Sequence, residues 1–546
     1  MYKPLWKFSI LCIIATAVTV LATAQSFYQT NAGRILFTSK AVAPVDISSK
    51  DVQQQMELTN KSNLFITVFL KKPLTSYLQE LAPGLSPDSL SRIGNYQFSF
   101  LVDDRLIYHT ELLPGAPRLS QQQQDTTWNK PLIDNGNEGA WWSQFAWNRF
   151  MYNGGDSALS DGAHVLRIIL RPYVKTSELL VGGIIAEGRL ELAVKRKPDI
   201  NLANTHLSAV RPYDGLPVSR DSFDQDKIKM LKAYIEAGAF RHVTSVVALK
   251  NGKILFEEYF NGSGRDSLHD VRSVGKSFAS TLTGMALHDH YLQSTGQTIG
   301  NLYDLTGYQN NSAAKAQVSL KELLTMSSRF DGNDDDANSP GNEENMYPTD
   351  NWVKFVLDLP LDTVKYYGQW HYFTAGVMLL GSTLDKVIPI GLEKYADTKL
   401  FKPLHIVNYQ WVYTPQHVPS TAGGIRMNAL DFAKYGQLYA NHGRWQGKQL
   451  LPESWVRETF SHQLPITGRK DEFYGYLFWN KMYHCNGQAY ETYYCSGNGG
   501  NKIFVFKDQP LVVVITATAY GSAYGHAQAD RIMEEFVLPA VLGHSK

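Results

Sequence analysis

The N-terminal part of the chain is built from short segments in which apolar and polar residues alternate, separated by turn-forming residues. Residues 64–70, 96–102, 164–170 and 189–194 show this alternation. A period of two places every second side chain on one face of a β-strand, and short strands at this spacing are typical of two packed sheets. The pattern therefore predicts a β-sandwich domain over residues 25–205.

A break in this pattern marks a domain boundary. After Lys195-Arg-Lys-Pro198 the periodicity lapses from residue 201 to residue 217, which is typical of a linker between domains. Helical spacing begins at residue 228. We therefore assign residues 206–546 to a second domain.

Hairpins near both ends of the second domain predict its architecture. Strand-like residues flank Asn251-Gly252, a strong hairpin signal, and a second strand-turn-strand pattern spans residues 503–517. A helical middle lies between them, and residues 527–542 have the pattern of a closing helix. This order predicts an α+β fold, in which an antiparallel sheet is flanked by helices and carries a helical insertion.

The composition agrees with two folded domains. At 546 residues the chain exceeds what one hydrophobic core usually organises, and 44% apolar with 19% charged residues supply material for buried cores. The formal net charge is only +1, and no long run of Lys or Arg is present. Neutralising phosphates requires such a basic surface, so a nucleic-acid partner is not expected.

The first 24 residues have the pattern of an export signal. Lys3 and Lys7 precede an apolar stretch that ends in Ala22-Thr-Ala24, the small-residue pattern of a cleavage site. We expect cleavage after Ala24 and a mature protein in the periplasm or outside the cell, without stable membrane insertion. The alternative is an uncleaved membrane anchor, since the apolar stretch approaches the length that spans a bilayer.

Two cysteines remain once this segment is removed. Cys485 and Cys495 lie in strand-like surroundings with Asn486-Gly487 between them, so a hairpin could bring the two thiols together. Exported proteins form disulfides, and one bond between these cysteines is therefore one interpretation. Two free buried thiols are the other.

A group of large aromatic residues stands out in the first domain. Its members are Trp141, Trp142, Phe145, Trp147 and Phe150. Large aromatic side chains supply much of the buried area of protein cores, so we interpret the cluster as core. The alternative is a carbohydrate platform, through which the N-terminal domain would contact a glycan or the cell wall.

The residues that suggest chemistry follow the first hairpin of the second domain. Ser273 and Lys276 lie three positions apart at the start of an apolar helical segment, and residues at this spacing share a helix face. A serine hydroxyl becomes a good nucleophile when a neighbouring base accepts its proton, and a lysine is a base only when it is neutral. Burial favours the neutral amine, and the helix N-terminus offers N–H groups to a developing oxyanion. Ser273 is the predicted nucleophile and Lys276 its base.

A second Ser-x-x-Lys sequence, Ser312-Ala-Ala-Lys315, shows that the motif alone has little specificity. This copy follows Asn310-Asn311 and precedes polar residues, without an apolar helix after it. We therefore interpret it as a solvated loop. The apolar context selects Ser273 instead.

Five sequence blocks, beginning with the one that contains Ser273 and Lys276, occur in a familiar order after about residue 211. They are Ser273-Val-Gly-Lys-Ser, Leu323-Leu-Thr-Met-Ser-Ser-Arg-Phe, Tyr372-Phe-Thr-Ala-Gly-Val, Thr421-Ala-Gly-Gly-Ile-Arg and Ser496-Gly-Asn-Gly-Gly-Asn-Lys. Together they resemble the serine β-lactamase-like and penicillin-binding-protein-like hydrolases, in particular the class C-related esterases and 6-aminohexanoate-oligomer hydrolases. The resemblance implies a β-lactamase-like catalytic domain and an acyl-enzyme mechanism.

The resemblance also implies roles for other residues. Tyr372 would share proton transfer with the lysine and help to protonate the leaving group. Asn498, Gly499 and Gly500 stand where relatives carry Lys or His followed by small residues, and the backbone N–H of Asn501 would complete the oxyanion hole. Glycines permit a close approach of backbone to a ligand, which fits this role. The alternatives are a structural tyrosine and an ordinary glycine-rich turn.

Two departures from the family pattern narrow the substrate. Thr374 replaces an asparagine that is usual in class C β-lactamases, and Asn498 replaces a cation that would bind a β-lactam carboxylate. We therefore expect a small or peptide-like ester or amide substrate. A weak β-lactamase or D,D-peptidase is one alternative, and a catalytically inactive sensor that binds the cell wall or a glycan is another.

Neither a cofactor nor a metal ion is expected. The pair His288-Asp-His290 places two imidazoles two positions apart, so on a helix they point to different sides. The acidic run from Asp331 to Asp336 lacks the glycine and the distal glutamate of an EF-hand loop. We interpret this run as a solvated loop.

Overall fold

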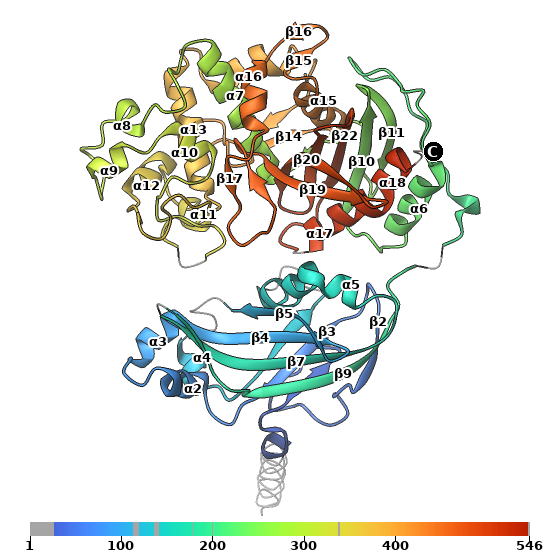
Figure 1. Ribbon diagram of the computed structural model, residues 1–546, viewed down its shortest axis with the longest axis vertical. Helices are drawn as coiled ribbons and strands as arrows, with labels where there is room; N and C mark the ends of the chain where they lie inside the picture. Colours follow the sequence, from blue (N-terminus) through green and yellow to red (C-terminus); the bar gives the residue numbers. More distant parts are fainter. Residues whose placement is uncertain are drawn as a thin grey trace, which may run out of the picture. The chain divides into compact units, whose positions relative to one another are not determined.

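The chain divides into two compact units, one ending at Pro198 and the other beginning at Asp199 (Figure 1). Each unit buries its own hydrophobic side chains. The predicted export signal, residues 1–24, lies outside the described residues. The computed structural model describes residues 27–112, 119–135, 141–176, 178–198, 200–336, 339–522 and 524–543.

The N-terminal unit contains two β-sheets built from the alternating segments. The larger sheet has the order β2-β9-β7-β4-β5, with β8 paired to β7, and the smaller sheet has the order β1-β3-β6. The pairs are antiparallel except β2 with β9, which are parallel. The strands are β1 (Ile35–Thr38), β2 (Gln55–Leu58), β3 (Leu64–Phe69), β4 (Gly94–Val102), β5 (Arg105–Glu111), β6 (Thr127–Ile133), β7 (Gly162–Lys175), β8 (Leu179–Val181) and β9 (Ala186–Val194).

Side chains from both sheets join one buried cluster, which includes Val68 of β3 and Phe98 of β4. Helical segments contribute to the same cluster, for example through Leu78. The sheet-rich architecture of this domain is confirmed. A β-sandwich, in which two sheets alone enclose the core, remains a prediction, because helical segments also contribute to this core. The helical segments are α2 (Leu74–Leu81), α3 (Pro87–Ile93), α4 (Leu119–Gln124), η1 (Ser143–Asn148), η2 (Met151–Gly155) and α5 (Asp156–Ala158).

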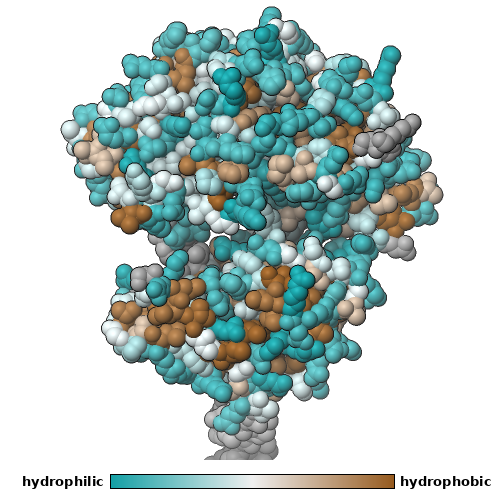
Figure 2. Space-filling model, viewed as in Figure 1, coloured by the Kyte–Doolittle hydropathy of each residue, from teal (hydrophilic) through white to brown (hydrophobic). Residues whose placement is uncertain are grey.

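The aromatic cluster of this unit belongs to the core. Trp147 is only 5% exposed and Phe150 is fully buried, while the other three members pack against them partly buried. The core interpretation is confirmed, and burial argues against an exposed carbohydrate platform. Other apolar residues, such as Leu106 and Ile184, are exposed, and Figure 2 shows brown, apolar areas on the visible face of this unit.

The second unit is organised around an eight-stranded antiparallel sheet with the order β11-β10-β22-β21-β20-β19-β18-β17. The two predicted hairpins are β10–β11 and β21–β22, and β10 pairs with β22. Strands from the two ends of the domain therefore lie side by side, which confirms the α+β prediction (Figure 1). The strands of this sheet are β10 (Val243–Lys250), β11 (Lys253–Tyr259), β17 (Leu464–Pro465), β18 (Phe473–Tyr474), β19 (Trp479–Cys485), β20 (Gln488–Gly497), β21 (Asn501–Phe506) and β22 (Leu511–Ala517).

Helices cover both faces of this sheet, because its strands are apolar on both sides. Val247 of β10 joins the buried cluster of α7, α13 and α15, whereas its neighbour Val246 joins the cluster of α6 and the C-terminal helices. The segment predicted as one closing helix is divided into α17, η6 and α18. The helices of both clusters are α6 (Gln225–Glu236), α7 (Gly275–His288), α13 (Thr374–Val387), α15 (Ala429–Ala440), α17 (Tyr524–Arg531), η6 (Ile532–Val537) and α18 (Leu538–Leu542).

The middle of the domain is the expected helical insertion, together with small sheets. Its short helices are α8 (Ile299–Leu302), α9 (Ala313–Ala316), α10 (Leu320–Leu324), α11 (Glu343–Met346), α12 (Trp352–Asp358), α14 (Leu392–Ala396), η5 (Asp397–Phe401) and α16 (Glu453–Thr459). The small sheets have the orders β12-β14-β13 and β15-β16. Their strands are β12 (His269–Asp270), β13 (Gln410–Trp411), β14 (Ile425–Met427), β15 (Arg444–Trp445) and β16 (Lys448–Gln449).

Cys485 and Cys495 are both free and buried, so the interpretation as free thiols is confirmed. The predicted hairpin exists, since β19 pairs with β20, but it places Cys485 opposite Gln488. From Gln488 to Cys495 the strand advances seven residues, or roughly 23 Å at about 3.3 Å per residue. The two cysteines also join different buried clusters. A disulfide requires Cα atoms within about 7 Å of each other, so this pair cannot form one.

No single helix among the described residues is long and apolar enough to cross a membrane. Thr374–Val387 and Leu392–Phe401, which meet at a bend of 85°, satisfy length and composition criteria only as a pair. The first of the two is α13, whose residues from Thr374 to Leu384 are buried in the protein. Such burial is typical of a helix in the core of a folded domain.

Candidate active site

Ser273 lies in a tight turn between a short strand and the buried helix α7. The turn is a 3₁₀ segment, η4 (Arg272–Val274), which is separated from β12 by Val271 alone. Strand β12 pairs with β14, and this pairing brings the residues just before β14 to the nucleophile. A local turn and a distant strand therefore position the serine together.

Two glycines allow the backbone around Ser273 to be this closely packed. A Cβ atom at Gly423 would overlap the carbonyl of Arg272, and one at Gly497 would overlap the carbonyl oxygen of Val271. Any larger residue would push the turn away from its neighbours. Arg272 itself has a positive φ of 52°, which marks the turn as conformationally unusual.

Lys276 is buried, and its amine faces the serine. Its Nζ donates a hydrogen bond to Ser273 Oγ at 2.7 Å and another to the carbonyl oxygen of Ala422 at 2.6 Å. The residue is 2% exposed, and burial lowers the pKa of its amine, while Glu343 and Asp334 oppose that shift. Burial therefore shifts the amine toward the neutral form that a base requires, and the two carboxylates limit that shift.

Tyr372 completes the group of predicted catalytic residues. It precedes α13, and its ring centroid lies 5.2 Å from Lys276 Nζ. Burial raises the pKa of its hydroxyl, and a hydrogen bond with Ser273 opposes that rise. The ring stacks against Trp479 of β19 with centroids 5.9 Å apart. Serine, lysine and tyrosine from three segments therefore meet at one point.

The glycine-rich turn joins β20 to β21 beside the nucleophile. Gly499 and Gly500 have φ values of 91° and 90°, a region that favours glycine. Gly497 pairs with Asn501 across the turn, and both strands contact η4. Asn501 is fully buried, and its side chain is fixed by Ala517 N–H at 2.9 Å and by carbonyl oxygens of Asn498 and Ala517. These bonds fix Asn501 at the start of β21, opposite Gly497, whose backbone lies against the turn of Ser273.

Asn498 has a different environment from the rest of this turn. Its side chain is exposed, and its Oδ1 accepts a hydrogen bond from the backbone N–H of Gly521 at 2.9 Å. The side chain therefore holds a neighbouring loop. It carries no positive charge toward a substrate.

Two further features of the site were not identified from the sequence. The carbonyl of Ala422 lies within the block Thr421-Ala-Gly-Gly, which offered the only signal for it. Asp334 lies in the acidic run, and the solvated-loop interpretation is wrong for this residue. Its carboxylate accepts hydrogen bonds from Thr374 N–H and Glu343 N–H, and burial together with Glu343 raises its pKa to about 6.

The second Ser-x-x-Lys sequence forms the start of helix α9; Ser312, Ala313 and Ala314 are exposed as expected, but the solvated-loop interpretation is wrong for Lys315. Lys315 is fully buried, and its Nζ donates hydrogen bonds to the carbonyl oxygens of Gln309 and Leu357 at 2.9 and 2.7 Å. Ser312 Oγ accepts a hydrogen bond from Lys315 N–H at 3.1 Å, which caps α9. The burial of Lys315 could not be predicted from the polar residues around the motif, because it depends on contacts with the distant helix α12.

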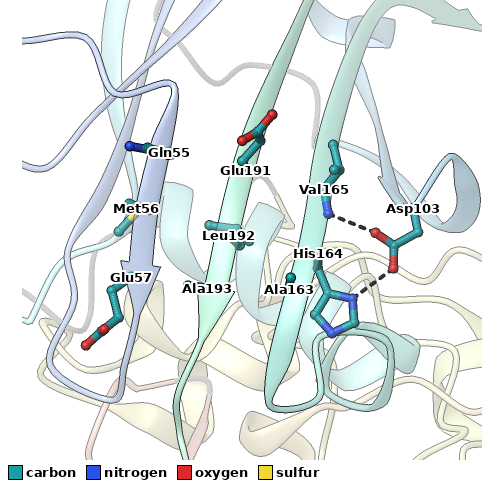
Figure 3. A pocket seen from close by; sticks show the side chains of 10 residues that line it. All are labelled: Gln55, Met56, Glu57, Asp103, Ala163, His164, Val165, Glu191, Leu192 and Ala193. Carbon is teal, nitrogen blue, oxygen red and sulfur yellow. Dashed lines mark hydrogen bonds and ion pairs between the residues drawn. The ribbon is translucent and has the colours of Figure 1, made fainter.

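A cavity of about 580 Å³ lies on the N-terminal unit, along β2, β9 and β7 (Figure 3). Asp103 lines it and accepts hydrogen bonds from Val165 N–H and His164 Nδ1, both at 2.8 Å. Its lining contains no serine or lysine, so it offers no nucleophile with a base. Among the described residues, no group of three or more His, Cys, Asp or Glu is placed to hold a metal ion.

Comparison with known proteins matches the sequence of the second unit to a family. The family model named Beta-lactamase matches residues 231–536, which is more than half of the chain and contains Ser273, Lys276 and Tyr372. Similar solved structures include a candidate 6-aminohexanoate-dimer hydrolase from Bacillus anthracis, with 15% identity, 59% of this chain and 89% of that chain covered, and a TM-score of 0.46. A penicillin-binding protein from Bacillus halodurans has 17% identity, 53% and 96% coverage, and a TM-score of 0.42. A D-stereospecific amidohydrolase from Streptomyces sp. has 15% identity, 56% and 95% coverage, and a TM-score of 0.43.

Proposed function

Because the chain belongs to the beta-lactamase family of serine hydrolases, we propose that it cleaves an ester or an amide through an acyl-enzyme on Ser273. The observation that supports this most directly is the 2.7 Å hydrogen bond between Lys276 Nζ and Ser273 Oγ. A buried amine at hydrogen-bond distance from a hydroxyl is the arrangement that activates a serine nucleophile.

The first half of the reaction forms the acyl-enzyme. Lys276 Nζ accepts the proton of Ser273 Oγ, and this oxygen attacks the carbonyl carbon of the substrate. The backbone N–H groups of Ser273 and Asn501 stabilise the negative charge on the carbonyl oxygen. Tyr372 then passes a proton to the leaving alcohol or amine as the bond to the carbonyl carbon breaks.

The second half releases the acyl group. Water attacks the carbonyl carbon of the ester on Ser273, and the same Lys276 and Tyr372 pair takes its proton. Ser273 Oγ leaves with a proton, and the carboxylic acid product dissociates. The residues of the first half thus act in reverse order, as microscopic reversibility requires.

We propose a small or peptide-like ester or amide as substrate, without a carboxylate that must be bound by a cation. Asn498 stands where relatives carry Lys or His. Its side chain is neutral, and its Oδ1 already accepts a hydrogen bond from Gly521 N–H. This favours an esterase or amidase over an efficient β-lactamase. An export signal at residues 1–24 would place the reaction in the periplasm or outside the cell, and an N-terminus at Gln25 in the mature protein would support that.

A substrate screen tests the proposal. p-Nitrophenyl acetate, a D-alanine p-nitroanilide and a chromogenic cephalosporin are offered to the wild type, to Ser273→Ala and to the control Ser312→Ala, with and without EDTA. We expect ester or anilide hydrolysis that survives EDTA and Ser312→Ala and is lost in Ser273→Ala. Activity that persists in Ser273→Ala, or that EDTA removes, would refute the mechanism, and an inert but folded wild type would favour a binding or sensor role.

A further inference from the structure

Asp334 connects to the backbone on both sides of Tyr372. Its own N–H donates a hydrogen bond to the carbonyl oxygen of Tyr372 at 2.8 Å. Its carboxylate Oδ2 accepts a hydrogen bond from the N–H of Thr374, two residues further along, at 2.7 Å. The tyrosine is therefore held between two hydrogen bonds to one residue.

The second carboxylate oxygen fixes Asp334 itself. Oδ1 accepts a hydrogen bond from the N–H of Glu343, the first residue of α11, at 2.8 Å. The side chain of Asn342 donates to the carbonyl oxygen of Asp334 at 3.2 Å. One carboxylate oxygen thus bonds to the first N–H of α13 and the other to the first N–H of α11. The side chain of Asp334 therefore connects the starts of these two helices.

The carboxylate is also part of the charge around Lys276. Asp334 and Glu343 are the two acidic groups that stabilise the protonated amine against burial. Glu343 accepts a hydrogen bond from Tyr347 at 2.6 Å. The negative charges of Glu343, Asp334 and Asp335 add to the rise that burial causes in the pKa of the Tyr372 hydroxyl. Because the pKa of Asp334 is raised only to about 6, this group is mostly ionised at neutral pH.

We propose that Asp334 is a positioning residue that holds Tyr372 at the Ser273 hydroxyl and supplies negative charge beside Lys276. The inference rests on the proposed function and extends it to a residue that does not touch the reacting atoms. Two consequences follow. Loss of the hydrogen bonds misplaces Tyr372, and loss of the charge makes Lys276 easier to deprotonate.

The variants Asp334→Asn and Asp334→Glu separate these two roles. Asparagine can accept from only one of the two N–H groups and is neutral, so kcat for p-nitrophenyl acetate should fall about 10- to 100-fold with little change in KM. The acid limb of its kcat/KM profile should move to lower pH, because removing a nearby negative charge lowers the pKa of a lysine. Glutamate keeps the charge but not the geometry, so its kcat should fall while the acid limb stays in place.

Glu344→Gln is the matched control. Glu344 is an exposed carboxylate on the same helix as Glu343, and it is not among the groups that shift the pKa of Tyr372 or Lys276. We expect kcat within about twofold of the wild type and an unmoved acid limb. Folding of all three variants is checked by circular dichroism and thermal unfolding.

The outcomes separate this inference from the proposed function. If the wild type itself fails to hydrolyse the ester or to react with a fluorophosphonate, the proposed function fails first. If the wild type is active, an unchanged kcat in Asp334→Asn overturns the positioning role, and a reduced kcat with an unmoved acid limb overturns the role of the charge beside Lys276. A reduced kcat with the limb moved to lower pH, seen in Asp334→Asn alone, supports both roles.

Discussion

The two Ser-x-x-Lys segments of the second unit share a sequence pattern and a buried lysine but differ in what the amine meets. Lys276 and Lys315 are 2% and 0% exposed, and burial lowers the pKa of both amines. The amine of Lys276 faces the hydroxyl of its serine, whereas that of Lys315 faces two backbone carbonyl oxygens. Burial of a lysine therefore does not by itself make a base.

The serines show the reason for the difference. Ser273 lies in the turn before α7, a helix of 14 residues, so its hydroxyl points along the same face as Lys276. Ser312 is the N-cap of the four-residue helix α9, and its oxygen is used by the backbone of Lys315. The Ser312 oxygen accepts the hydrogen bond of a backbone N–H at the start of its own helix. The amine of Lys315 therefore bonds to backbone carbonyl oxygens instead of the serine hydroxyl.

The largest expected effect is that of replacing the two lysines in parallel. Lys276→Met removes the base, so kcat for p-nitrophenyl acetate should fall about 10²- to 10⁴-fold in a folded protein. Lys315→Met should keep kcat near the wild-type value but lose about 1–3 kcal/mol of stability, since two buried carbonyl groups lose their donor. Steady-state kinetics and urea unfolding measure both. Equal losses of activity would remove the distinction between the segments.

Replacing the tyrosine beside Ser273 should give the next largest effect. Tyr372→Phe removes the group that protonates the leaving group, so we expect a loss of about 10²-fold. The loss should be greater for an anilide than for p-nitrophenyl acetate, because the p-nitrophenolate leaves without a proton. Tyr308→Phe, close to the second motif, is the control and should have no effect on either substrate. Equal losses on both substrates would exclude Tyr372 from leaving-group protonation.

The pH dependence of activity should reflect the buried amine of Lys276. The amine must be unprotonated to act, so kcat/KM should rise with pH and then level off. Because burial lowers the pKa of Lys276, this rise should be centred below the usual lysine value of about 10.4. If the pH profile of kcat/KM in Lys315→Met matches that of the wild type, the rise with pH is assigned to Lys276. A limb that moves in Lys315→Met would contradict the assignment.

The smallest expected effect is on stability alone. Ser312→Ala removes the N-cap of α9 and should cost about 1 kcal/mol, with unchanged kcat and KM. Urea unfolding and ester hydrolysis measure the two quantities. A loss of activity beyond about twofold would give Ser312 a role that its hydrogen bond to Lys315 N–H does not explain.

Local sequence pattern predicted the parts of this site that are close in sequence. The spacing of Ser273 and Lys276, the hairpins that form the central sheet and the glycines before Asn501 all depend on neighbouring residues. The carbonyl of Ala422, the ties of Asp334 and the burial of Lys315 depend on segments far apart in the chain. Such contacts leave no periodic signal, since a carbonyl group is present at every residue.

The two cysteines show the same limit of prediction from local sequence. The sequence correctly indicates a hairpin between Cys485 and Cys495, but the register of that hairpin decides whether the sulfur atoms meet. The turn at Asn486-Gly487 pairs Cys485 with Gln488, so Cys495 lies far along the strand. Register follows from the tight turn, which the disulfide interpretation did not use.

The most direct test of the account is to find which serine reacts. The wild type is treated with a fluorophosphonate probe and cleaved with trypsin, and the labelled peptides are identified by mass spectrometry. Cleavage after Arg272 and Lys276 separates Ser273 from Ser312. We predict one adduct on the peptide Ser273-Val-Gly-Lys276, absent in Ser273→Ala. An adduct on the peptide that carries Ser312, or none in an active protein, would contradict the account.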